Sequence, residues 1–308
     1  MQGYRVRPAT LEDVGPVARM IAEGDVHDYG EVTFFESDLV DFLHRPRLDM
    51  AEDTWVFEDE HGKPAAFGWV WVRTENEHVV VMGVVHPEHR GRGLGSTVAQ
   101  LMEDRARRIV AGRPEGAETV VTSAIAATDP SARALLEARG YREARIFWRM
   151  RRILDAPVER EADPAGVAVR PADPATDAEP MHRVIEEAFL DHFRPRYEPY
   201  DEWLERNLRH PGRLVWFLAV MEGEVVGALT GSIEEGKAHV DQIGVLREAR
   251  RRGIGEQLLR EAFAAFANAD ARLVELDVDS ENRTGATALY ERVGMSLALS
   301  YVFYDKTI

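Results

Sequence analysis

Predominantly hydrophobic residues form two pairs of short segments, one pair in each half of the chain. In the first half the segments run from Trp55 to Asp59 and from Ala65 to Val72, and the turn between them contains glycine and proline. In the second half they run from Trp216 to Met221 and from Val225 to Gly231 around another glycine-containing turn. Two apolar segments on either side of a tight turn are typical of a β-hairpin. We therefore predict one hairpin in each half.

A third apolar segment follows each hairpin, at 79–85 in the first half and 239–245 in the second. Each is followed in turn by a long segment, 96–110 or 256–267, whose apolar residues recur with helical spacing. Strands that alternate with helices in this way indicate a mixed sheet flanked by helices. The fold class we predict is α/β, more closely α+β.

The two halves share this plan because the chain repeats itself over the length of a whole domain. The sequence Val-Arg-Pro-Ala at 6–9 recurs at 169–172, and the closing glycine Gly140 recurs as Gly294. A chain of 308 residues with 45% hydrophobic content is large enough for two separate cores. The repeat is far longer than the unit of a solenoid, so it indicates two domains in tandem.

We place the domain boundaries where the hydrophobic periodicity stops. Residues 154–166 bear prolines and charges without any apolar period, and we interpret them as a linker. The N-terminal domain is then 1–153, and the C-terminal domain is 167–308.

Charge and composition exclude several classes of function. The net charge of −16 argues against nucleic acid as a partner, because a phosphate backbone needs a basic face. The half after Ile153 is the more acidic, which favours a cationic substrate there unless the charge only makes the surface soluble. No apolar run is long enough to span a bilayer and no leader is evident at the N-terminus, so we expect a cytoplasmic protein that does not bind membranes. The absence of cysteine excludes thiolate metal sites and a cysteine-linked acyl-enzyme, and we expect no metal.

The most informative repeat is a basic, glycine-rich turn that joins the third strand to the long helix. It runs from Val84 to Gly95 in the first half and from Gly244 to Gly255 in the second. A strand, a glycine turn and a helix N-terminus together point backbone N–H groups at one spot, which favours an anion such as a pyrophosphate. The final glycine of a dinucleotide fingerprint is missing, and so is the lysine of a P-loop. The alternative is a surface turn whose glycines only cap the strand and the helix.

The turn resembles the acyl-CoA-binding motif of the GNAT superfamily of acetyltransferases. Its pattern is arginine or glutamine, two residues, glycine, one residue, and glycine or alanine, which both Arg90 to Gly95 and Arg250 to Gly255 satisfy. The segment from Ala288 to Met295 is similar to the closing helix and turn of the family. The resemblance implies two tandem GNAT domains, each with a mostly antiparallel sheet whose central strand pair splays apart.

The resemblance also implies acetyl-CoA as cosubstrate and direct transfer of the acetyl group to the amine of a small molecule. Such direct transfer is consistent with a chain that has no cysteine to carry an intermediate. The residues that it assigns to acyl-CoA binding lie around the two turns and on the strands before them. They are Val85, Arg90, Gly91, Arg92, Gly93, Leu94, Gly95 and Ser96 in the first copy, and Ile243, Val245, Arg250, Arg251, Arg252, Gly253, Ile254, Gly255, Glu256 and Asn282 in the second.

Catalytic residues are implied for the second copy only. Tyr290 lies four residues before Gly294, where relatives often carry the acid that protonates the leaving thiolate. His239 and Asp241 lie on the strand before the turn, where relatives carry the base, and which of them is the base stays open. Counted by the same offset, the first copy has Leu136, Val79 and Val81 at these places. We therefore expect a catalytic C-terminal domain and a non-catalytic N-terminal domain with an acyl-CoA turn.

Several alternatives stay open at this point. Tyr290 is also compatible with simple packing, His239 with an exposed strand position, and Asp241 with a structural cap. The whole protein is alternatively a non-catalytic acyl-CoA sensor or regulatory module, or its first domain is active through other groups. The aromatic and charged segment from Phe189 to Trp203 suits a loop that lines the substrate pocket, but also an ordinary helix and turn. We expect a monomer or a homodimer.

Overall fold

The computed structural model divides the chain into two compact units. The N-terminal unit comprises Met1–Ile146 and Ser300–Ile308, and the C-terminal unit comprises Phe147–Leu299. The structure describes residues 3–45, 47–74, 78–111, 118–155, 158, 162–195, 197–209, 213–234, 236–282 and 284–308, without the side chains of 73, 74 and 209.

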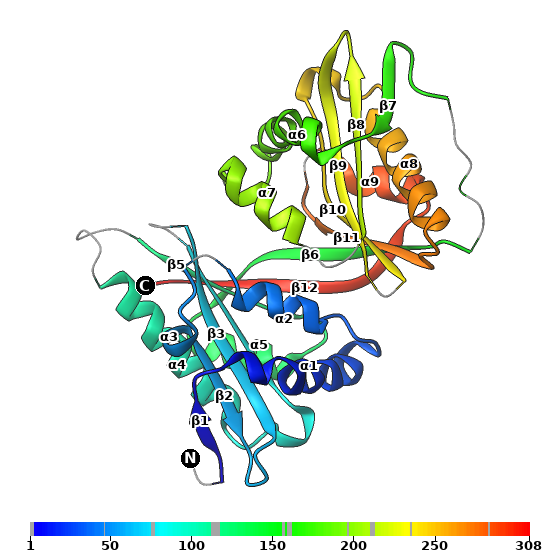
Figure 1. Cartoon of the computed structure of the whole chain (residues 1–308). Coiled ribbons are helices and arrows are strands. Elements are labelled where there is room, and N and C mark those ends of the chain that lie inside the picture. The colour runs from blue at the N-terminus through cyan, green and yellow to red at the C-terminus, as the bar shows by residue number, and fades with distance from the viewer. Residues whose placement is uncertain are drawn as a thin grey trace. The chain divides into compact units, whose positions relative to one another are not determined.

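In the N-terminal unit, six strands form one sheet in the order β1-β2-β3-β4-β5-β12 (Figure 1). Its elements are β1 (Arg5–Arg7), the short 3-10 helix η1 (Leu11–Asp13), α1 (Val14–Tyr29), α2 (Glu36–Leu43), α3 (Met50–Asp53), β2 (Thr54–Glu58), β3 (Pro64–Thr74), β4 (His78–Val85), η2 (Pro87–His89), α4 (Leu94–Val110), β5 (Val120–Ala126), α5 (Pro130–Ala138) and parts of β6 (Arg142–Ile153) and β12 (Ser296–Thr307).

The C-terminal unit repeats this arrangement, with the strand order β6-β11-β10-β9-β8-β7. Its elements are β7 (Val167–Pro171), α6 (Pro174–Phe189), α7 (Tyr200–Arg209), β8 (Arg213–Met221), β9 (Glu224–Glu234), β10 (Lys237–Val245), η3 (Arg247–Ala249), α8 (Ile254–Asn268), β11 (Leu273–Asp279), α9 (Ala286–Arg292) and the remaining parts of β6 and β12. Both predicted hairpins and both predicted long helices are present, so the predicted fold class is confirmed.

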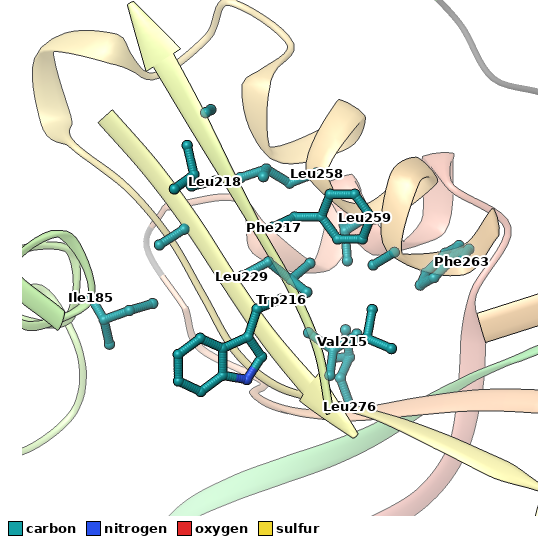
Figure 2. Packing of buried hydrophobic residues seen from close by; sticks show 14 of the residues in the cluster. Ile185, Val215, Trp216, Phe217, Leu218, Leu229, Leu258, Leu259, Phe263 and Leu276 are labelled. Carbon is teal, nitrogen blue, oxygen red and sulfur yellow. The ribbon is translucent and has the colours of Figure 1, made fainter. Parts of the chain in front are cut away.

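Apolar side chains from both faces of each sheet build the cores. In the C-terminal unit, α8 packs Leu258, Leu259 and Phe263 onto one face of β8 and β9, and Ile185 of α6 covers the other face (Figure 2). We call these two faces of the C-terminal sheet the α8 face and the α6–α7 face. The N-terminal unit has the same two layers, with α4 on one face and α1 and α2 on the other.

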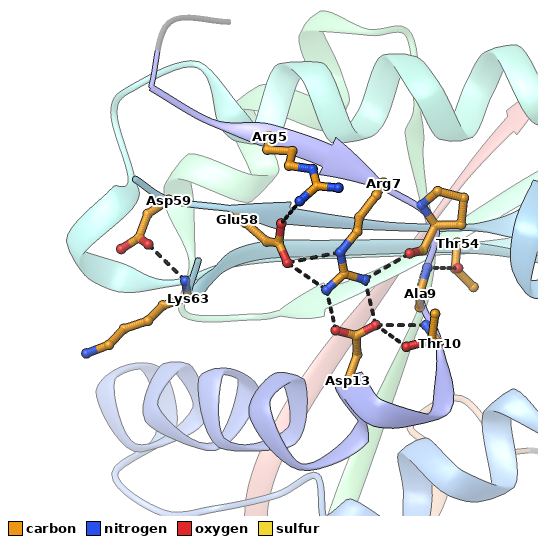
Figure 3. Close-up of polar contacts among 10 residues, drawn as sticks. Arg5, Arg7, Ala9, Thr10, Asp13, Thr54, Glu58, Asp59 and Lys63 are labelled. Atoms are coloured by element: carbon orange, nitrogen blue, oxygen red, sulfur yellow. Dashed lines mark hydrogen bonds and ion pairs between the residues drawn. The ribbon is translucent and has the colours of Figure 1, made fainter. Parts of the chain in front are cut away.

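The repeated Val-Arg-Pro-Ala sequence has a structural reason. In the N-terminal unit, Arg7 donates two hydrogen bonds to Asp13 at 2.6 and 2.7 Å and is also paired with Glu58 (Figure 3). In the C-terminal unit, Arg170 donates to both oxygens of Asp177 at 2.8 and 2.9 Å. A two-pronged bond of this kind fixes geometry as well as charge. The arginine therefore ties the first strand of each unit to the start of its first helix.

The central strands of both sheets splay apart, as the resemblance implies. Strand β4 pairs with β5 only over 78–81, although β4 continues to Val85. Strand β10 pairs with β11 only over 237–239, although β10 continues to Val245. The unpaired part of each strand leads directly into the glycine turn.

The last strand of each copy lies in the sheet of the other unit. Residues 301–307 of β12 pair with β5 of the N-terminal unit, and residues 147–153 of β6 pair with β11 of the C-terminal unit. Val302 and Met150 are both buried in these adopted cores. The ranges 1–153 and 167–308 thus describe the repeat in the sequence, whereas the compact units cross them. Parts of the expected linker, 154–166, lie outside the described residues.

This exchange predicts which unit a core substitution weakens. Val302→Ala removes two methyl groups from the N-terminal core and should lower that unit's free energy of unfolding by about 2 kcal/mol. Hydrogen exchange should then accelerate in 120–126 and not in 213–245. Val274→Ala, in β11, is the matched control and should have the opposite pattern. Faster exchange of 213–245 in Val302→Ala would contradict the exchange of strands.

Candidate active site

Each glycine turn ends in a helix whose first amides have no protein partner. Gly93 and Gly253 occupy the N-cap positions of α4 and α8 with φ of 84° and 81°, and neither helix has a side-chain cap. Among the described residues, Thr97 and Gln257 are the first amides in these helices for which an acceptor is present. Elsewhere, Asp129 and Asp173 cap α5 and α6. Helix α9 also begins at a glycine, Gly285, without a side-chain cap, but only α4 and α8 follow the basic turns. The starts of α4 and α8 therefore fit a pyrophosphate, which would supply the missing acceptors.

The first arginine of each turn braces the turn itself. Arg90 donates from Nε to the Val85 carbonyl and from its two terminal nitrogens to Asp28, at 2.8 and 2.7 Å. Arg250 repeats the first bond at 3.0 Å to the Val245 carbonyl.

The remaining partner of Arg250 is Asp191, just after α6, at 2.8 Å. Arg247 also binds Asp191, and the two arginines lower the pKa of that carboxyl. The side chains of Arg90 and Arg250, expected to contact acyl-CoA, are thus occupied by carboxylates in this structure. Each joins its turn to the end of the first helix of its unit.

The other expected acyl-CoA residues divide into three groups. Leu94 and Ile254 are buried, so their side chains are not available at the turn. Glu256 is paired with Arg260 at 2.8 Å, and Asn282 accepts from the Thr284 amide at 2.7 Å, so both side chains stabilise their own surroundings. The third group is exposed or lies on the splayed strands and turns: Val85, Gly91, Arg92, Gly93, Gly95, Ser96, Ile243, Val245, Arg251, Arg252, Gly253 and Gly255.

Strand β10 carries a β-bulge that the sequence analysis did not foresee. Val240 pairs with Gly231 and Gln242 with Thr230, so Asp241 has no partner in β9. Val240 and Val245 both face α8, because a Cβ on their respective cross-strand partners Gly231 and Gly227 would meet α8 side chains. In a regular strand, residues five positions apart face opposite sides. Val240 and Val245 face the same side, so β10 must contain one extra residue between them.

The bulge corrects the alignment between the two copies. Strand β4 has no such extra residue over 79–85. The alignment of the two copies by a constant offset, which matched Val79 to His239 and Val81 to Asp241, was therefore wrong. By strand register, the counterpart of His239 is Val80, and Asp241 has no counterpart in the first copy. The contrast between the copies persists, because Val80 is no more able to accept a proton than Val79.

The structure brings His239 and Asp241 together on the α6–α7 face. Nδ1 of His239 lies 3.1 Å from Oδ1 of Asp241, and Nε2 lies 4.0 Å from Oδ2 of Asp277. Burial lowers the pKa of His239, but the hydrogen bond to Asp241 and the charges of Asp241 and Asp277 outweigh burial, so that the pKa is raised overall. Arg149 binds both oxygens of Asp277 at 2.9 Å and weakens that effect.

A row of acids along β11 was also missed. Alternate residues of this strand, Glu275, Asp277 and Asp279, share one face, whereas the first copy has Thr122, Ala124 and Ala126 at the corresponding positions. The signal in the sequence was the alternation of acidic and apolar residues from 275 to 279. Arg151 pairs with Glu275 as Arg149 pairs with Asp277. Ion pairs therefore line the α6–α7 face, whereas in the first copy Thr122 is hydrogen-bonded to Asp305 and His78.

Tyr290 and Leu136 occupy matching positions, as expected. Each is 7% exposed, and its carbonyl accepts from the amide five residues further on at 3.0 Å. Burial raises the pKa of Tyr290 to about 12, so the phenol keeps its proton at neutral pH. Within the described part of the chain, no hydrogen bond of the Tyr290 hydroxyl is present. The phenol is therefore an uncommitted donor.

The aromatic segment expected to line the substrate pocket is only partly available for that role. Trp203 of α7 is fully buried, and its Nε1 donates to Oε1 of Gln242 at 2.7 Å. Phe189 stacks on His192 with ring centroids 4.1 Å apart, and burial lowers the pKa of His192. Arg196 lies outside the described residues.

Two features are absent from the described residues. No helix among them is long and apolar enough to cross a membrane. No group of three or more histidine or acidic side chains among them is arranged to hold a metal ion.

The fold and the site together define a class of enzyme: tandem α/β domains with a splayed strand pair and an anion-binding helix start are the architecture of an acyl-CoA-dependent acyltransferase. The acetyltransferase (GNAT) family model matches residues 21–141 and 179–295. The chain belongs to the GNAT family of acetyltransferases, and the resemblance seen in the sequence is confirmed. Membership implies acetyl-CoA as cosubstrate.

Individual relatives support this assignment. Mycothiol acetyltransferase of Salinispora arenicola is 30% identical over 236 residues, which are 72% of this chain and 71% of the relative. The crystal structure of a GCN5-related N-acetyltransferase from Sphaerobacter thermophilus is 31% identical, with a TM-score of 0.84 over 100% of this chain and 96% of that one. A tandem GNAT protein from the clavulanic acid biosynthesis pathway shares the fold at 20% identity, with a TM-score of 0.80 over 99% and 98%.

The two turns differ at one strained position, which yields a prediction. Arg251 has a φ of 62°, where the first copy has Gly91 with a φ of 73°. The left-handed conformation costs a non-glycine residue about 1–2 kcal/mol, partly offset by the lower flexibility of its unfolded chain. Arg251→Gly should therefore raise the free energy of unfolding by about 0.5–1 kcal/mol. Gly91→Ala should lower it by about 1 kcal/mol.

Chemical denaturation measures both changes, and calorimetry with acetyl-CoA adds a second observable. Weaker acetyl-CoA binding by the more stable Arg251→Gly variant would show that the strained backbone is retained because the Arg251 side chain contributes to binding. Loss of stability in Arg251→Gly would contradict the strain argument.

Proposed function

We propose that the C-terminal unit transfers the acetyl group of acetyl-CoA directly to the amine of a small molecule, and that the N-terminal unit binds acyl-CoA without turnover. One observation carries the proposal. Both units have the uncapped helix start, but the side chains at two matched positions differ. The C-terminal unit has a proton acceptor, His239 beside Asp241, and a buried phenol, Tyr290, where the N-terminal unit has Val80 and Leu136.

His239 is the proposed base. An amine must lose a proton to attack a thioester, and the most effective acceptor titrates near the working pH. The charges of Asp241 and Asp277 stabilise the imidazolium that forms, which makes the imidazole a stronger base. Asp241 then orients His239 and shares its charge, although a direct role for Asp241 as base is the alternative that the experiment below distinguishes.

Tyr290 is the proposed acid. Acetyl-CoA supplies the acetyl group as a thioester, whose carbon–sulfur bond breaks as the bond to the acceptor nitrogen forms. The departing thiolate needs a proton, and the phenol of Tyr290, whose pKa burial raises to about 12, is protonated at neutral pH and can supply it. Leu136 in the first copy has no proton to give.

The acceptor is proposed to be a cationic amine. Glu275 and Asp277 are neutralised by Arg151 and Arg149, but the carboxylate of Asp241 on the α6–α7 face attracts an ammonium group before it is deprotonated. Relatives named mycothiol acetyltransferase at about 30% identity support a small-molecule acceptor, and the unacetylated form of mycothiol comes first in a panel of amines.

The pH dependence of turnover tests the assignment of the base. Because His239 must be unprotonated, kcat/KM should rise with pH through a midpoint above 6.5. Asp241→Asn removes the bond and the charge that raise the pKa of His239, so the midpoint should move to lower pH. His239→Gln should lower kcat by roughly 10²–10⁴ and abolish this ionisation. If Asp241→Asn abolishes the ionisation and His239→Gln only shifts it, Asp241 is the base.

The duplicated turns provide a matched test of which unit reacts. Valine is strongly disfavoured at a φ near 80°, so Gly253→Val and Gly93→Val each disable one turn. Calorimetry should show one acetyl-CoA binding event lost in either variant, and thiol release from an amine panel should be lost only in Gly253→Val.

Tyr290→Phe provides the complementary test of chemistry. It should keep acetyl-CoA binding and lower kcat by about 10² or more. Binding without turnover of any amine by the unmodified protein would favour the acyl-CoA sensor. Turnover lost in Gly93→Val and unaffected by Tyr290→Phe would assign the reaction to the N-terminal unit.

A further inference from the structure

The hydrogen bond between Trp203 and Gln242 joins helix α7 to the strand that carries the proposed base. Trp203 is completely buried, and a buried indole N–H normally requires an acceptor. Oε1 of Gln242 is that acceptor, at 2.7 Å. The bond is possible only while Gln242 faces α7.

The bulge at Asp241 is what turns Gln242 toward α7. Val240 faces α8, and in a regular strand Gln242 would face α8 as well. Beyond the bulge, Gly244 faces the same side of the sheet as Gln242, since a Cβ there would lie 2.8 Å from the Cβ of Ala188 in α6. With this sequence, loss of the bulge would therefore turn either His239 or Gln242 into the opposite, apolar face.

The first copy shows the arrangement without these features. Met82 takes the place of Gln242 by strand register and has no hydrogen-bonding side chain for a helix above it. Strand β4 continues there without a bulge, and no residue corresponds to Asp241. The bulge, the polar Gln242 and the carboxylate beside the proposed base thus occur together in the second copy.

We propose that Trp203 and Gln242 are positioning residues: their hydrogen bond holds the bulge in β10, and the bulge holds the Asp241 carboxylate against His239. Neither residue touches the reacting atoms in this proposal. Helix α7, which lies on the side of the expected acceptor segment, thereby controls the geometry of the proton acceptor. The inference rests on the proposed function only in calling His239 the base.

The test uses the full chain and two tryptophans that differ in one respect. Trp203→Phe keeps an aromatic ring but removes the N–H that binds Gln242. Trp216→Phe is the matched control, because Trp216 is also buried but its Nε1 has no partner among the described residues. Gln242→Met introduces the residue of the first copy and is a second route should Trp203→Phe fail to fold.

The primary measurement is the titration of His239 by NMR, with its signal assigned by its loss in His239→Gln. The charged groups around His239 are Asp241 on β10, Asp277 on β11 and Arg149 on β6. Trp203→Phe and Gln242→Met should lower the pKa of His239 in the same direction as Asp241→Asn, and Trp216→Phe should leave it unchanged. The kcat/KM of both test variants should fall by about ten- to a hundredfold.

The outcomes separate this inference from the proposed function. A His239 pKa that stays at the wild-type value in both Trp203→Phe and Gln242→Met overturns the inference, even if activity falls. An equal shift in Trp216→Phe overturns it too, because general loosening then suffices. If the pKa shifts as expected while the pH profile of kcat/KM does not follow, the inference holds and His239 is not the base.

Discussion

The backbone amides at the start of α4 and α8 are the constraint on which both units depend. A helix that begins without a cap leaves several N–H groups unsatisfied, and this arrangement is unfavourable unless water or an anion accepts from them. In both units it is combined with a glycine at the N-cap and with an arginine that binds both the strand carbonyl and a carboxylate at the end of the unit's first helix. The bracing residues keep the amides exposed without occupying them.

The splayed strands provide backbone groups without a strand partner, as the helix starts provide backbone amides without a cap. Where β4 and β5, or β10 and β11, stop pairing, backbone groups of the inner strands are released next to the helix start. An extended ligand can complete such a strand with main-chain hydrogen bonds. The duplication has preserved this polar framework in both units, while the side chains around it have diverged. The groups left available for a cofactor in both units are therefore largely backbone groups, whereas the proposed chemistry depends on a few side chains of the C-terminal unit.

Much of this arrangement was predictable from the sequence, and the reasons for the failures are specific. The hairpins, long helices and glycine turns follow from local periodicity and from residues that permit a left-handed backbone, so their positions were predicted closely. The bulge at Asp241 has no local signature in the sequence. It is evident only from which residues of β10 face α8, and this depends on how β10 pairs with β9. The partners of Arg90 and Arg250 are likewise distant in sequence. The acidic row on β11 was visible as an alternation, but its meaning depends on which face of the sheet it occupies.

The exchange of closing strands could not have been predicted, because either copy of the final strand satisfies the same pattern of buried and exposed residues. It has a consequence for how the protein is made. During synthesis on the ribosome, an N-terminal domain normally folds before the rest of the chain is complete. Here the N-terminal sheet lacks the strand that pairs with β5 until residues 300–308 have been synthesised. The C-terminal sheet, in contrast, has its borrowed strand from the outset, so the domain translated second is the first that has all its strands.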